Sequence, residues 1–528
     1  MTTPSDPAGA RTPRGDWRDG LPAGARLPPG FERADLPAVD AIRFDSRAVR
    51  PGDAFVCVEG ERFDGHAFAA RAAEAGAAVL IAKDGRGEAL RAALDVPVLE
   101  VPDPRRALSS LADANKGYPA RRLTVIGITG TDGKSTTAFL AHAALEACGV
   151  RAGLLTTIGT RVTPGAELTS NATRLTTQEA PVVQALLAEM VDAGCTHAVV
   201  EATSHGLALD RLADCEFDIA VLTNLTSDHL DFHGTFEAYR AAKLRLFSML
   251  TAPTSKRVRR VAIVNRDDRS WERFAKAAQG GSVEVLTYGL RSRGVDLRAR
   301  DVLAWPDGST FSLVTDEWEI DASVPLPGAF NVLNATAAIA IAAALDLDPM
   351  AAASGVARAT GVPGRMQRLE GAPFPVIVDY AHTPEAMRQV LAELTPLVEG
   401  RVIVVFGCAG ERSPDRRTGL GKAVAGLGAY AVLTEEDPRS EDPAAILEEI
   451  AGAMTAAGAA EGERFERVPD RRDAIARALA IATPSDLVLL AGKGHESTIE
   501  RASGAIPWNE ARTAAELIEA RFGASSGD

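Results

Sequence analysis

Short apolar runs alternate with amphipathic, Ala-rich runs along most of this chain, which is the pattern of an α/β protein with mostly parallel sheets covered by helices. Residues 296–326 instead predict a group of short strands around a Pro-Asp-Gly turn. The pattern predicts strands at 54–58, 78–82, 123–128, 152–155, 197–201, 219–225, 261–265, 376–378, 402–406, 430–434 and 487–490, and helices at 138–148, 179–193, 236–249 and 327–345.

The length and the breaks in this pattern divide the chain into three domains, as 528 residues suggest. Residues 1–36 are rich in Pro, Gly, Arg and Asp, and we expect them to form a mobile tail. A small α/β lobe is expected at 37–119 and a central α/β domain at 120–363. A third, Rossmann-like α/β domain is expected at 364–528.

Composition limits the function classes. The 57 basic and 71 acidic residues give a net charge of −14, which argues against binding to nucleic acid or to an anionic membrane. No apolar run approaches the roughly 20 residues of a membrane span, and no signal peptide is visible. The five cysteines are scattered and lack CxxC spacing, so we expect reduced thiols and a cytoplasmic protein.

A Gly-rich turn between the strand at 123–128 and the following helix is the strongest chemical signal. It has the sequence Gly130-Thr-Asp-Gly-Lys-Ser135. Backbone N–H groups at a helix start bind anionic oxygens, Lys134 can neutralise phosphate charge, and Ser135 offers a hydroxyl to Mg²⁺. Ile128 stands where the strict P-loop pattern has its first glycine, but the flanking strand and helix favour a nucleotide site.

Several residues of the central domain are candidates for metal binding. Glu201 ends a strand beside the phosphate loop and could hold Mg²⁺, although it could equally be an ordinary strand-end acid. A pair such as His229 and His233 more often makes loop hydrogen bonds, and spacing alone marks Lys243 as a surface lysine. Six of the eight histidines nevertheless lie in polar clusters, which favours a functional role: His66, His205, His229, His233, His382 and His495.

Polar clusters follow four predicted strands of the third domain, at the edge of a parallel sheet where ligands bind. Charges of both signs at this edge form either a solvated rim or a site for a zwitterionic ligand. In the second case Arg would bind a carboxylate and an acid would pair with an ammonium group. The charged residues are Arg417, Glu436, Asp437, Arg439 and Glu496.

Taken together, these motifs resemble the Mur ligases from about Asp45 to Glu496. The resemblance implies an N-terminal UDP-binding lobe, a central P-loop ATPase and a C-terminal domain for the incoming amino acid. It also implies cytoplasmic peptidoglycan synthesis, in which ATP activates a carboxylate as an acyl phosphate and an amine attacks it. The chain is most similar to the members that add a diamino acid to UDP-N-acetylmuramoyl-L-alanyl-D-glutamate, and we expect a monomer.

The resemblance assigns roles residue by residue. ATP contacts would come from Gly130, Thr131, Asp132, Gly133, Lys134, Ser135, Thr136, Asn331, Asn334, Arg365, Asp379 and His382. Mg²⁺ would be held by Ser135, Glu201, His229 and a carbamoylated Lys243. The UDP-muramoyl peptide would contact Ser46, Arg47, Thr176, Thr177, Ser204 and Arg211, and the amino acid Arg417, Glu436, Asp437, Arg439, Gly492 and Glu496. Lys134, Lys243 and His229 would be catalytic.

Some residues depart from the family pattern. Asp132 replaces the usual Asn and would weaken ATP binding, Ser135 replaces Thr, and Gln178 replaces Pro. The diaminopimelate-adding members have Asp-Asn-Pro-Arg where this chain has Glu-Asp-Pro-Arg at 436–439. Arg439 favours meso-diaminopimelate, whereas Asp437 leaves lysine or ornithine open.

Two other functions remain open at this stage. A non-catalytic P-loop sensor of a nucleotide-sugar would tolerate Asp132 and Gln178. Such a sensor would not need all four of Lys134, Glu201, His229 and Lys243. A related ligase such as a folylpolyglutamate synthase is disfavoured by the Asp-Ser-Arg segment at 45–47 and by the charged edge at 436–439.

Overall fold

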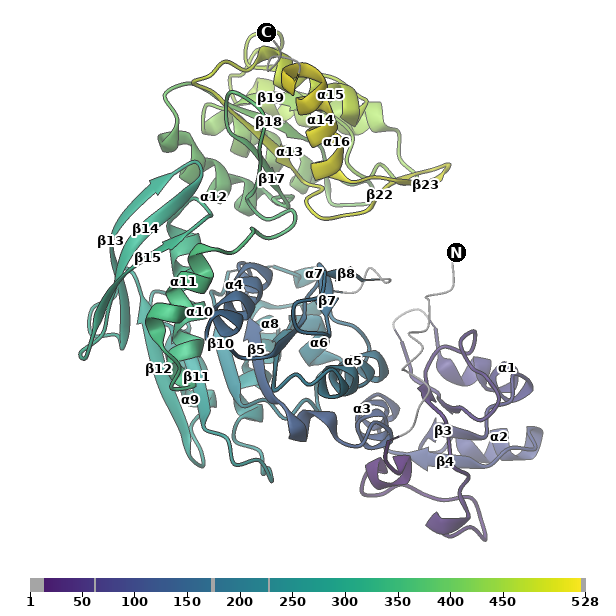
Figure 1. Ribbon diagram of the computed structural model, residues 1–528. Coiled ribbons are helices and arrows are strands. Elements are labelled where there is room, and N and C mark those ends of the chain that lie inside the picture. The colour runs from purple at the N-terminus through teal and green to yellow at the C-terminus, as the bar shows by residue number, and fades with distance from the viewer. Residues whose placement is uncertain (1–13, 61–62, 172–175, 227, 524–528) are drawn as a thin grey trace. The chain divides into compact units, whose positions relative to one another are not determined.

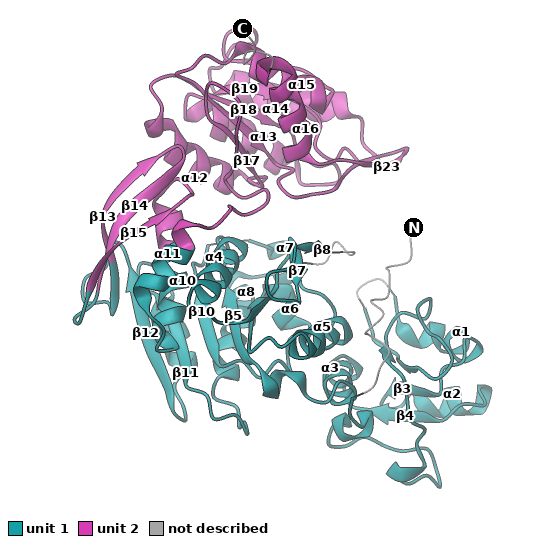
Figure 2. Cartoon of the chain, in the orientation of Figure 1, with its two compact units in different colours: residues 1–298, 315–318, 334–355 teal, residues 299–314, 319–333, 356–528 magenta. Residues whose placement is uncertain are grey.

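The computed structural model describes residues 14–60, 63–171, 176–226 and 228–523 (Figure 1). The chain forms two compact units (Figure 2). The first contains residues 1–298, 315–318 and 334–355, and the second contains residues 299–314, 319–333 and 356–528. Both are α/β with mostly parallel sheets, so the expected fold class is confirmed.

The N-terminal lobe of the first unit contains a four-stranded, all-parallel sheet in the order β1-β2-β3-β4. Alternate residues of β3 pack on opposite faces, because successive side chains of a strand point to opposite sides. The elements are β1 (Ile42–Arg43), β2 (Ala54–Val56), β3 (Val79–Lys83), β4 (Val98–Val101), α1 (Ala69–Glu74), α2 (Gly87–Ala93), α3 (Pro104–Asn115) and the 3-10 turn η4 (Gly65–Phe68). The next 3-10 turn, η5 (Pro119–Arg122), packs into the core of the central sheet through Ala120.

Residues 14–36 belong to this lobe and not to the mobile tail that we expected over residues 1–36. Trp17 and Leu36 are each 2% exposed within the lobe's core, and the Trp17 indole donates to the Pro37 carbonyl at 3.0 Å. Two 3-10 turns, η2 (Trp17–Gly20) and η3 (Arg33–Asp35), shape the segment. Burial of the large Trp17 side chain thus holds this segment on the lobe, although the composition of the segment is that of a loop. Residues 1–13 lie outside the described residues.

The central sheet of the first unit runs β12-β11-β10-β5-β9-β6-β7-β8. Its strands from β12 to β6 are parallel, and β7 and β8 add an antiparallel edge. The strands are β5 (Thr124–Thr129), β6 (Ala152–Leu155), β7 (Gly159–Arg161), β8 (Thr169–Ser170), β9 (His197–Glu201), β10 (Ile219–Leu222), β11 (Arg260–Asn265) and β12 (Val283–Gly289).

Strand β13 (Leu297–Trp305) starts beside β12 and continues into the second unit, where β14 (Gly308–Val314) and β15 (Glu319–Val324) form an antiparallel hairpin. The sequence placed this hairpin inside the central domain. Helix α10 (Ala329–Ala344) also contains residues of both units.

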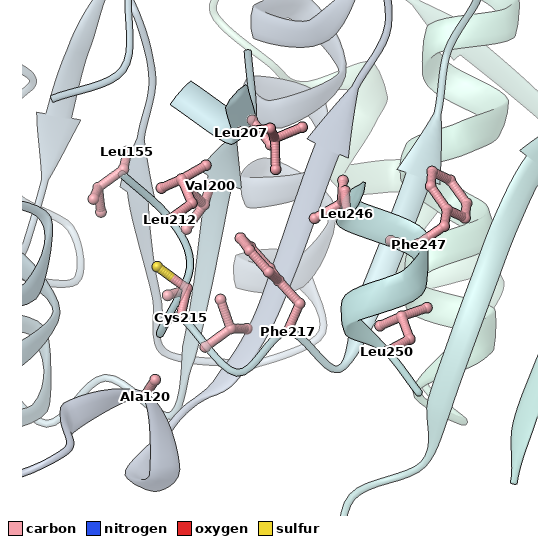
Figure 3. Packing of buried hydrophobic residues seen from close by; sticks show 14 of the residues in the cluster. Ala120, Leu155, Val200, Leu207, Leu212, Cys215, Phe217, Leu246, Phe247 and Leu250 are labelled. Carbon is pink, nitrogen blue, oxygen red and sulfur yellow. The ribbon is translucent and has the colours of Figure 1, made fainter. Parts of the chain in front are cut away.

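One face of the central sheet forms an apolar core with α5 (Ala180–Asp192), α8 (Phe236–Met249) and α9 (Trp271–Ala277). Figure 3 shows Leu155, Val200 and Phe217 of this core together with Leu246, Phe247 and Leu250. The other helices of the first unit are α4 (Lys134–Ala147), α6 (Ser204–Ala208), α7 (Leu230–His233) and α11 (Pro349–Ala357), the last of which also extends into the second unit.

The second unit has a six-stranded sheet in the order β16-β17-β21-β18-β19-β20, parallel except for β16. The strands are β16 (Gln367–Leu369), β17 (Val376–Asp379), β18 (Val402–Phe406), β19 (Tyr430–Leu433), β20 (Phe465–Arg467) and β21 (Leu487–Ala491), with a separate hairpin of β22 (Thr498–Arg501) and β23 (Gly504–Pro507). The helices are α12 (Pro384–Leu394), α13 (Pro414–Gly426), α14 (Pro443–Ala456), α15 (Arg471–Ile481), α16 (Glu510–Phe522) and the turn η6 (Thr395–Leu397).

The polar clusters that follow β17, β18, β19 and β21 therefore share one edge of this sheet, as the sequence predicted. All five cysteines are free thiols. Among the described residues, none of the helices combines the length and the apolar character that crossing a membrane requires.

Candidate active site

The loop between β5 and α4 brings backbone close to its surroundings at two glycines. A Cβ atom on Gly130 would lie 1.9 Å from the Thr223 hydroxyl oxygen. Gly133 has φ +78°, and a Cβ atom there would lie 2.3 Å from Asn334 Oδ1. Because only glycine fits both positions, the loop can present its N–H groups at the start of α4, which is the geometry of an anion site.

Polar side chains at the start of α4 close this loop. Lys134 Nζ donates to the Thr131 carbonyl at 2.7 Å, and Ser135 Oγ donates to Glu201 Oε2 at 2.8 Å. The same Glu201 oxygen accepts the Thr157 N–H at 2.9 Å, and Glu201 is buried. A buried carboxylate and a hydroxyl are hard oxygen donors, so these residues fit Mg²⁺.

Lys243 on α8 lies beneath the phosphate loop and is not a surface residue. It is 1% exposed, and its Nζ donates to the Gly130 carbonyl and lies 4.6 Å from the centre of the Tyr239 ring. Burial and the nearby Lys134 charge hold the pKa of Lys243 well below its usual value. Both effects favour the uncharged amine, which is the form that reacts with CO₂.

The candidate histidine His229 starts α7 with φ +52° and is about half exposed. Its ring centre lies 4.8 Å from that of His205, and its Nε2 lies 3.4 Å from Asp228 Oδ2. Burial lowers the pKa of His229, which favours the neutral imidazole that can bind a metal ion. His233 also lies near His205, with ring centres 5.5 Å apart.

The two candidate asparagines on α10 differ in their partners. Asn334 Oδ1 accepts the Thr137 hydroxyl at 3.2 Å and faces Gly133, as described above. Asn331, which belongs to the second unit, donates to the Pro327 carbonyl at 2.8 Å. Both are buried. Asn334 is thus placed at the phosphate loop, while Asn331 is three residues earlier on the same helix.

The expected peptide-binding segment lies next to a pocket. The Thr177 and Thr203 hydroxyls are 2.7 Å apart, and Arg211 Nη1 donates to the Thr177 carbonyl at 2.9 Å. Ser204 Oγ and Arg211 Nε are buried donors that find no hydrogen-bond partner within the described residues. The pocket is lined by Leu155, Thr156, Thr160, Thr176, Thr177, Gln178, Val183, Val200, Glu201 and Leu212.

In the N-terminal lobe, Ser46 is buried, whereas Arg47 is largely exposed and binds Asp45 at 2.6 Å. The hydrogen bonds from Arg47 lower the pKa of Asp45. His66 lies in a separate cluster with Asp64 and Glu59 whose ligand atoms lie within 4.8 Å of one another. Its Nδ1 bonds Asp64 at 2.6 Å and its Nε2 accepts the Lys83 N–H at 3.0 Å, so both ring nitrogens serve the fold.

In the second unit, the buried Lys493 organises the charged edge of the sheet. Its Nζ donates to Asp437 Oδ1 at 2.9 Å and to Glu496 Oε2 at 2.6 Å. The Glu500 N–H also donates to Asp437 Oδ1 at 2.8 Å. The Asp437 charge is therefore already balanced within this unit, and it does not stand free for a ligand ammonium group.

Glu436 and Arg439 occupy the same edge. Glu436 is 6% exposed, its Oε2 has no partner in the described part of the chain, and burial raises its pKa to about 7. A Cβ atom on Gly492 (φ +102°) would lie 2.9 Å from that oxygen. Arg439 has φ +55°, its N–H donates to the Glu500 carbonyl at 2.8 Å, and its guanidinium lies 3.9 Å from Glu411.

Arg417 is engaged by its own domain. It is 3% exposed, and its guanidinium donates to Glu441 at 2.6 Å and to Glu449 at 3.0 Å. Two acids thus balance its charge.

Arg365, Asp379 and His382 gather around the loop after β17. Asp379 accepts the Met366 and Ala381 N–H groups, each at 2.8 Å. Arg365 lies over the Tyr380 ring at 4.6 Å, and His382 Nδ1 bonds the Tyr380 carbonyl at 2.6 Å. The Tyr380 hydroxyl donates to Glu496 at 3.2 Å, which links this loop to the charged edge.

The sequence did not single out three residues that the structure brings into these sites. Tyr239 bonds Thr131 and lies beside Lys243, Glu179 binds Arg211, and Lys493 links two acids. Lys493 carried a usable signal, since it lies between two glycines three residues before Glu496. Tyr239 and Glu179 contact residues that are distant in sequence and carried no local signal.

Comparison with known proteins gives matches over most of the chain. Three family models match: "Mur ligase family, catalytic domain" at residues 38–116, "Mur ligase middle domain" at 128–342 and "Mur ligase, glutamate ligase domain" at 364–494. A UDP-N-acetylmuramyl-tripeptide synthetase of Roseiflexus sp. (strain RS-1) is 45% identical, covering 91% of this chain and 94% of its own length.

Two further matches name an amino acid. The UDP-N-acetylmuramoyl-L-alanyl-D-glutamate–2,6-diaminopimelate ligase of Streptomyces coelicolor is 42% identical over 91% of this chain and 92% of its own. A solved structure of a ligase with the same name is 31% identical, has a TM-score of 0.65, and covers 94% of this chain and 97% of its own.

Proposed function

The chain belongs to the Mur ligase family of ATP-dependent amide-forming ligases, and from this premise we propose that it adds a diamino acid to UDP-N-acetylmuramoyl-L-alanyl-D-glutamate. The observation that carries the proposal is the buried Lys243, which contacts the Gly130 carbonyl of a glycine loop whose Ser135 bonds Glu201. We place the reaction in the cytoplasm, as a step of peptidoglycan precursor synthesis.

The chain's own residues divide the work of the first unit. Ser46 and Arg47 contact the UDP group, and Ser204 and Arg211 offer their unpartnered buried donors to the muramoyl peptide. The loop N–H groups and Lys134 bind the ATP phosphates while Ser135 and Glu201 hold Mg²⁺. When bound there, Mg²⁺ neutralises charge on the phosphate oxygens.

Carbamoylation of Lys243 fits its surroundings. The side chain is buried, where an ammonium group is disfavoured, and it feels the charges of Lys134 and Glu201. The uncharged amine would add to CO₂ and release one proton to solvent, which gives a carbamate whose carboxylate would suit a second metal ion next to the phosphate loop. His229, with its lowered pKa, would be the neutral imidazole ligand of this pair.

The amino acid is held in the second unit. Arg439 is the guanidinium that would bind a distal carboxylate, and Glu436, whose buried Oε2 has no partner among the described residues, would pair with a ligand ammonium group together with Glu496. Lys493 bonds both Asp437 and Glu496, so Asp437 gives no separate reason to prefer lysine or ornithine, and we favour meso-diaminopimelate because Arg439 can pair with its second carboxylate. Lysine and ornithine remain the alternatives.

The test is phosphate release with ATP, Mg²⁺ and UDP-muramoyl-Ala-Glu, with meso-diaminopimelate, lysine and ornithine in separate reactions. Release that requires one amino acid identifies both the reaction and the acceptor. Nucleotide binding without acceptor-dependent release would instead favour a non-catalytic nucleotide-sugar sensor. Activity only with a folate substrate would indicate a folylpolyglutamate synthase.

A further inference from the structure

We propose that Glu179 is a positioning residue for the muramoyl peptide. Its carboxylate holds Arg211 against the segment 176–178 and ties that segment to helix α3 of the N-terminal lobe. The inference rests on the proposed function, because it takes this segment to bind the muramoyl peptide. It concerns a residue that contacts other side chains, and not the reacting atoms.

The first part of the argument is the geometry of Arg211. Glu179 Oε1 lies 2.7 Å from Arg211 Nη2, while Arg211 Nη1 donates to the Thr177 carbonyl at 2.9 Å. Two fixed contacts on a planar guanidinium set its orientation, and hence the direction of the third nitrogen. That nitrogen, Nε, is buried and has no partner among the described residues. Glu179 thus determines where Arg211 presents its Nε–H group.

The second part is the other oxygen of the same carboxylate. Glu179 Oε2 lies 3.6 Å from Arg105 Nη1 in the first turn of α3, and α3 packs against α5 (Figure 1). Glu179 immediately precedes α5 as its N-cap residue and is 8% exposed. One buried carboxylate therefore balances an arginine of the N-terminal lobe and an arginine of the central domain.

This arrangement matches the shape of the proposed substrate. Its UDP group would bind the N-terminal lobe, while its peptide would bind beside Thr177 and Arg211. A fixed contact between the lobe and the peptide segment would keep the peptide carboxylate at a constant distance from the phosphate loop when the UDP group is bound. Loss of this link should weaken the productive binding of the whole substrate and leave ATP binding unchanged.

The neighbouring Arg106 provides a matched control. It also joins the lobe to the central domain, with its two Nη atoms 2.5 and 2.8 Å from the Asp214 carboxylate. The described contacts of Arg106 include none with residues 176–179. A variant at Arg106 therefore loosens the same contact between lobe and domain without touching the peptide segment.

The experiment compares Glu179→Gln, Arg105→Gln and Arg106→Gln by phosphate release, with UDP-muramoyl-Ala-Glu varied at saturating ATP and amino acid. Glu179→Gln should raise KM for the muramoyl substrate about tenfold, because it removes the charged hydrogen bond to the buried Arg211 and the ion pair to the partly exposed Arg105. Arg105→Gln should raise the same KM about threefold, and Arg106→Gln less than about twofold. KM for ATP should stay within about twofold in all three.

Two further variants test the route of the effect. Glu179→Asp retains the charge and should recover part of the lost affinity. The double variant Glu179→Gln/Arg211→Lys should raise KM by clearly less than the product of the two single effects, since Glu179 acts mainly through Arg211 and only in part through Arg105. Melting temperatures show which variants are folded, and Arg105→Gln carries the test if Glu179→Gln does not fold.

Three outcomes would overturn the positioning role while the wild type remains active: an unchanged KM in Glu179→Gln, an Arg106→Gln effect as large as that of Arg105→Gln, or additive effects in the double variant. An inactive wild type would instead overturn the proposed function, and with it the assignment of this segment to the muramoyl peptide.

Discussion

At the scale of single residues, the chemistry depends on groups whose charge is set by burial. Lys243, Glu436 and Lys493 are all inside the protein, but their states differ because their neighbours differ. Lys493 has two acids to balance it, Lys243 has a second lysine nearby, and Glu436 has an oxygen without a partner among the described residues. The sequence singled out Lys243 and Glu436 but not Lys493, and it showed none of these contacts.

The variant Lys243→Ala tests the proposal that a carbamoylated Lys243 is needed for activity. We expect almost complete loss of phosphate release, because the carbamate that would bind a second metal ion beside Glu201 can no longer form. A short-chain carboxylate such as acetate or propionate should partly restore the rate by filling the space of the lost group. Lys256→Ala, which removes another buried lysine far from the glycine loop in sequence, should gain nothing from the same additive. Full activity of Lys243→Ala without additive would contradict the role.

Arg439→Ala tests the acceptor. The variant should raise KM for meso-diaminopimelate at least tenfold, since a lost charged hydrogen bond costs about 1.5–3 kcal/mol. KM for ATP should not change, because the phosphate loop lies in the first unit. Lysine lacks the second carboxylate and serves as the control amino acid. An unchanged KM for meso-diaminopimelate would count against this acceptor.

The backbone conformation of Arg439 limits which residues this position accepts. Its φ of +55° is unusual for a residue with a side chain, and strain of this kind is concentrated at functional sites. The backbone bond from its N–H to Glu500 holds the conformation. The sequence pattern does not predict a left-handed backbone conformation at an arginine, so only the charge of Arg439 could be predicted.

At the scale of elements, the sequence was most successful where an apolar run is buried on both faces. The strands at 152–155, 197–201 and 402–406 and the helix at 236–249 are confirmed at both ends. Each is preceded by a polar residue, namely Arg151, Thr196, Arg401 and Thr235, which makes its start visible in the sequence.

Other elements were wrong or missed for identifiable reasons. Helix α4 starts at Lys134 and not at residue 138, because the polar run Lys-Ser-Thr-Thr has the composition of a loop but caps the phosphate site. The hairpin β22–β23 and the edge strands β7 and β8 were missed because they are short and largely polar. Strand β12 was missed because several of its residues are exposed.

Helix α3 carries a buried acid whose titration can be tested. Asp113 is 5% exposed, and one of its oxygens has no partner among the described residues. Burial raises the pKa of Asp113 to about 8. The negative charges of Asp214 and Glu216 add to this increase, and the positive charges of Arg121 and Arg106 oppose it. In the unfolded chain the same carboxyl group titrates near 4.

The sign of the effect follows from proton binding. Between about pH 4 and pH 8 the folded protein keeps the Asp113 proton that the unfolded chain has released, so the free energy of unfolding falls as pH rises. Asp113→Asn cannot ionise and should be more stable than the wild type above pH 8, by on the order of a few kcal/mol. The two should converge near pH 4. Denaturant unfolding curves at several pH values measure this, and parallel pH dependences would refute it.

At the scale of the whole molecule, the phosphate loop belongs to the first unit and the amino-acid cluster to the second. Amide formation needs both substrates together and water excluded from the acyl phosphate. We therefore expect ATP, the muramoyl substrate and the amino acid together to change the small-angle scattering profile of the protein. Identical profiles with and without the three ligands would contradict a rigid-body rearrangement.

The three-domain expectation came from the sequence because each domain has its own run of strands and helices. The sequence could not reveal that the β14–β15 hairpin groups with the second unit, or that residues 14–36 pack onto the first. Both depend on contacts between segments that are distant along the chain. Trp17, for example, is buried because the turn that contains it packs against α3.

The positions of the thiols allow the protein to be labelled with a fluorophore at one cysteine. Four of the five, Cys57, Cys195, Cys215 and Cys408, are buried, and Cys148 alone is partly exposed. Cys148 caps the end of α4, the helix whose first turn carries Lys134 and Ser135. A maleimide fluorophore should therefore label the unmodified chain at a single position. Its emission would report nucleotide binding from the far end of that helix, without removal of any native cysteine.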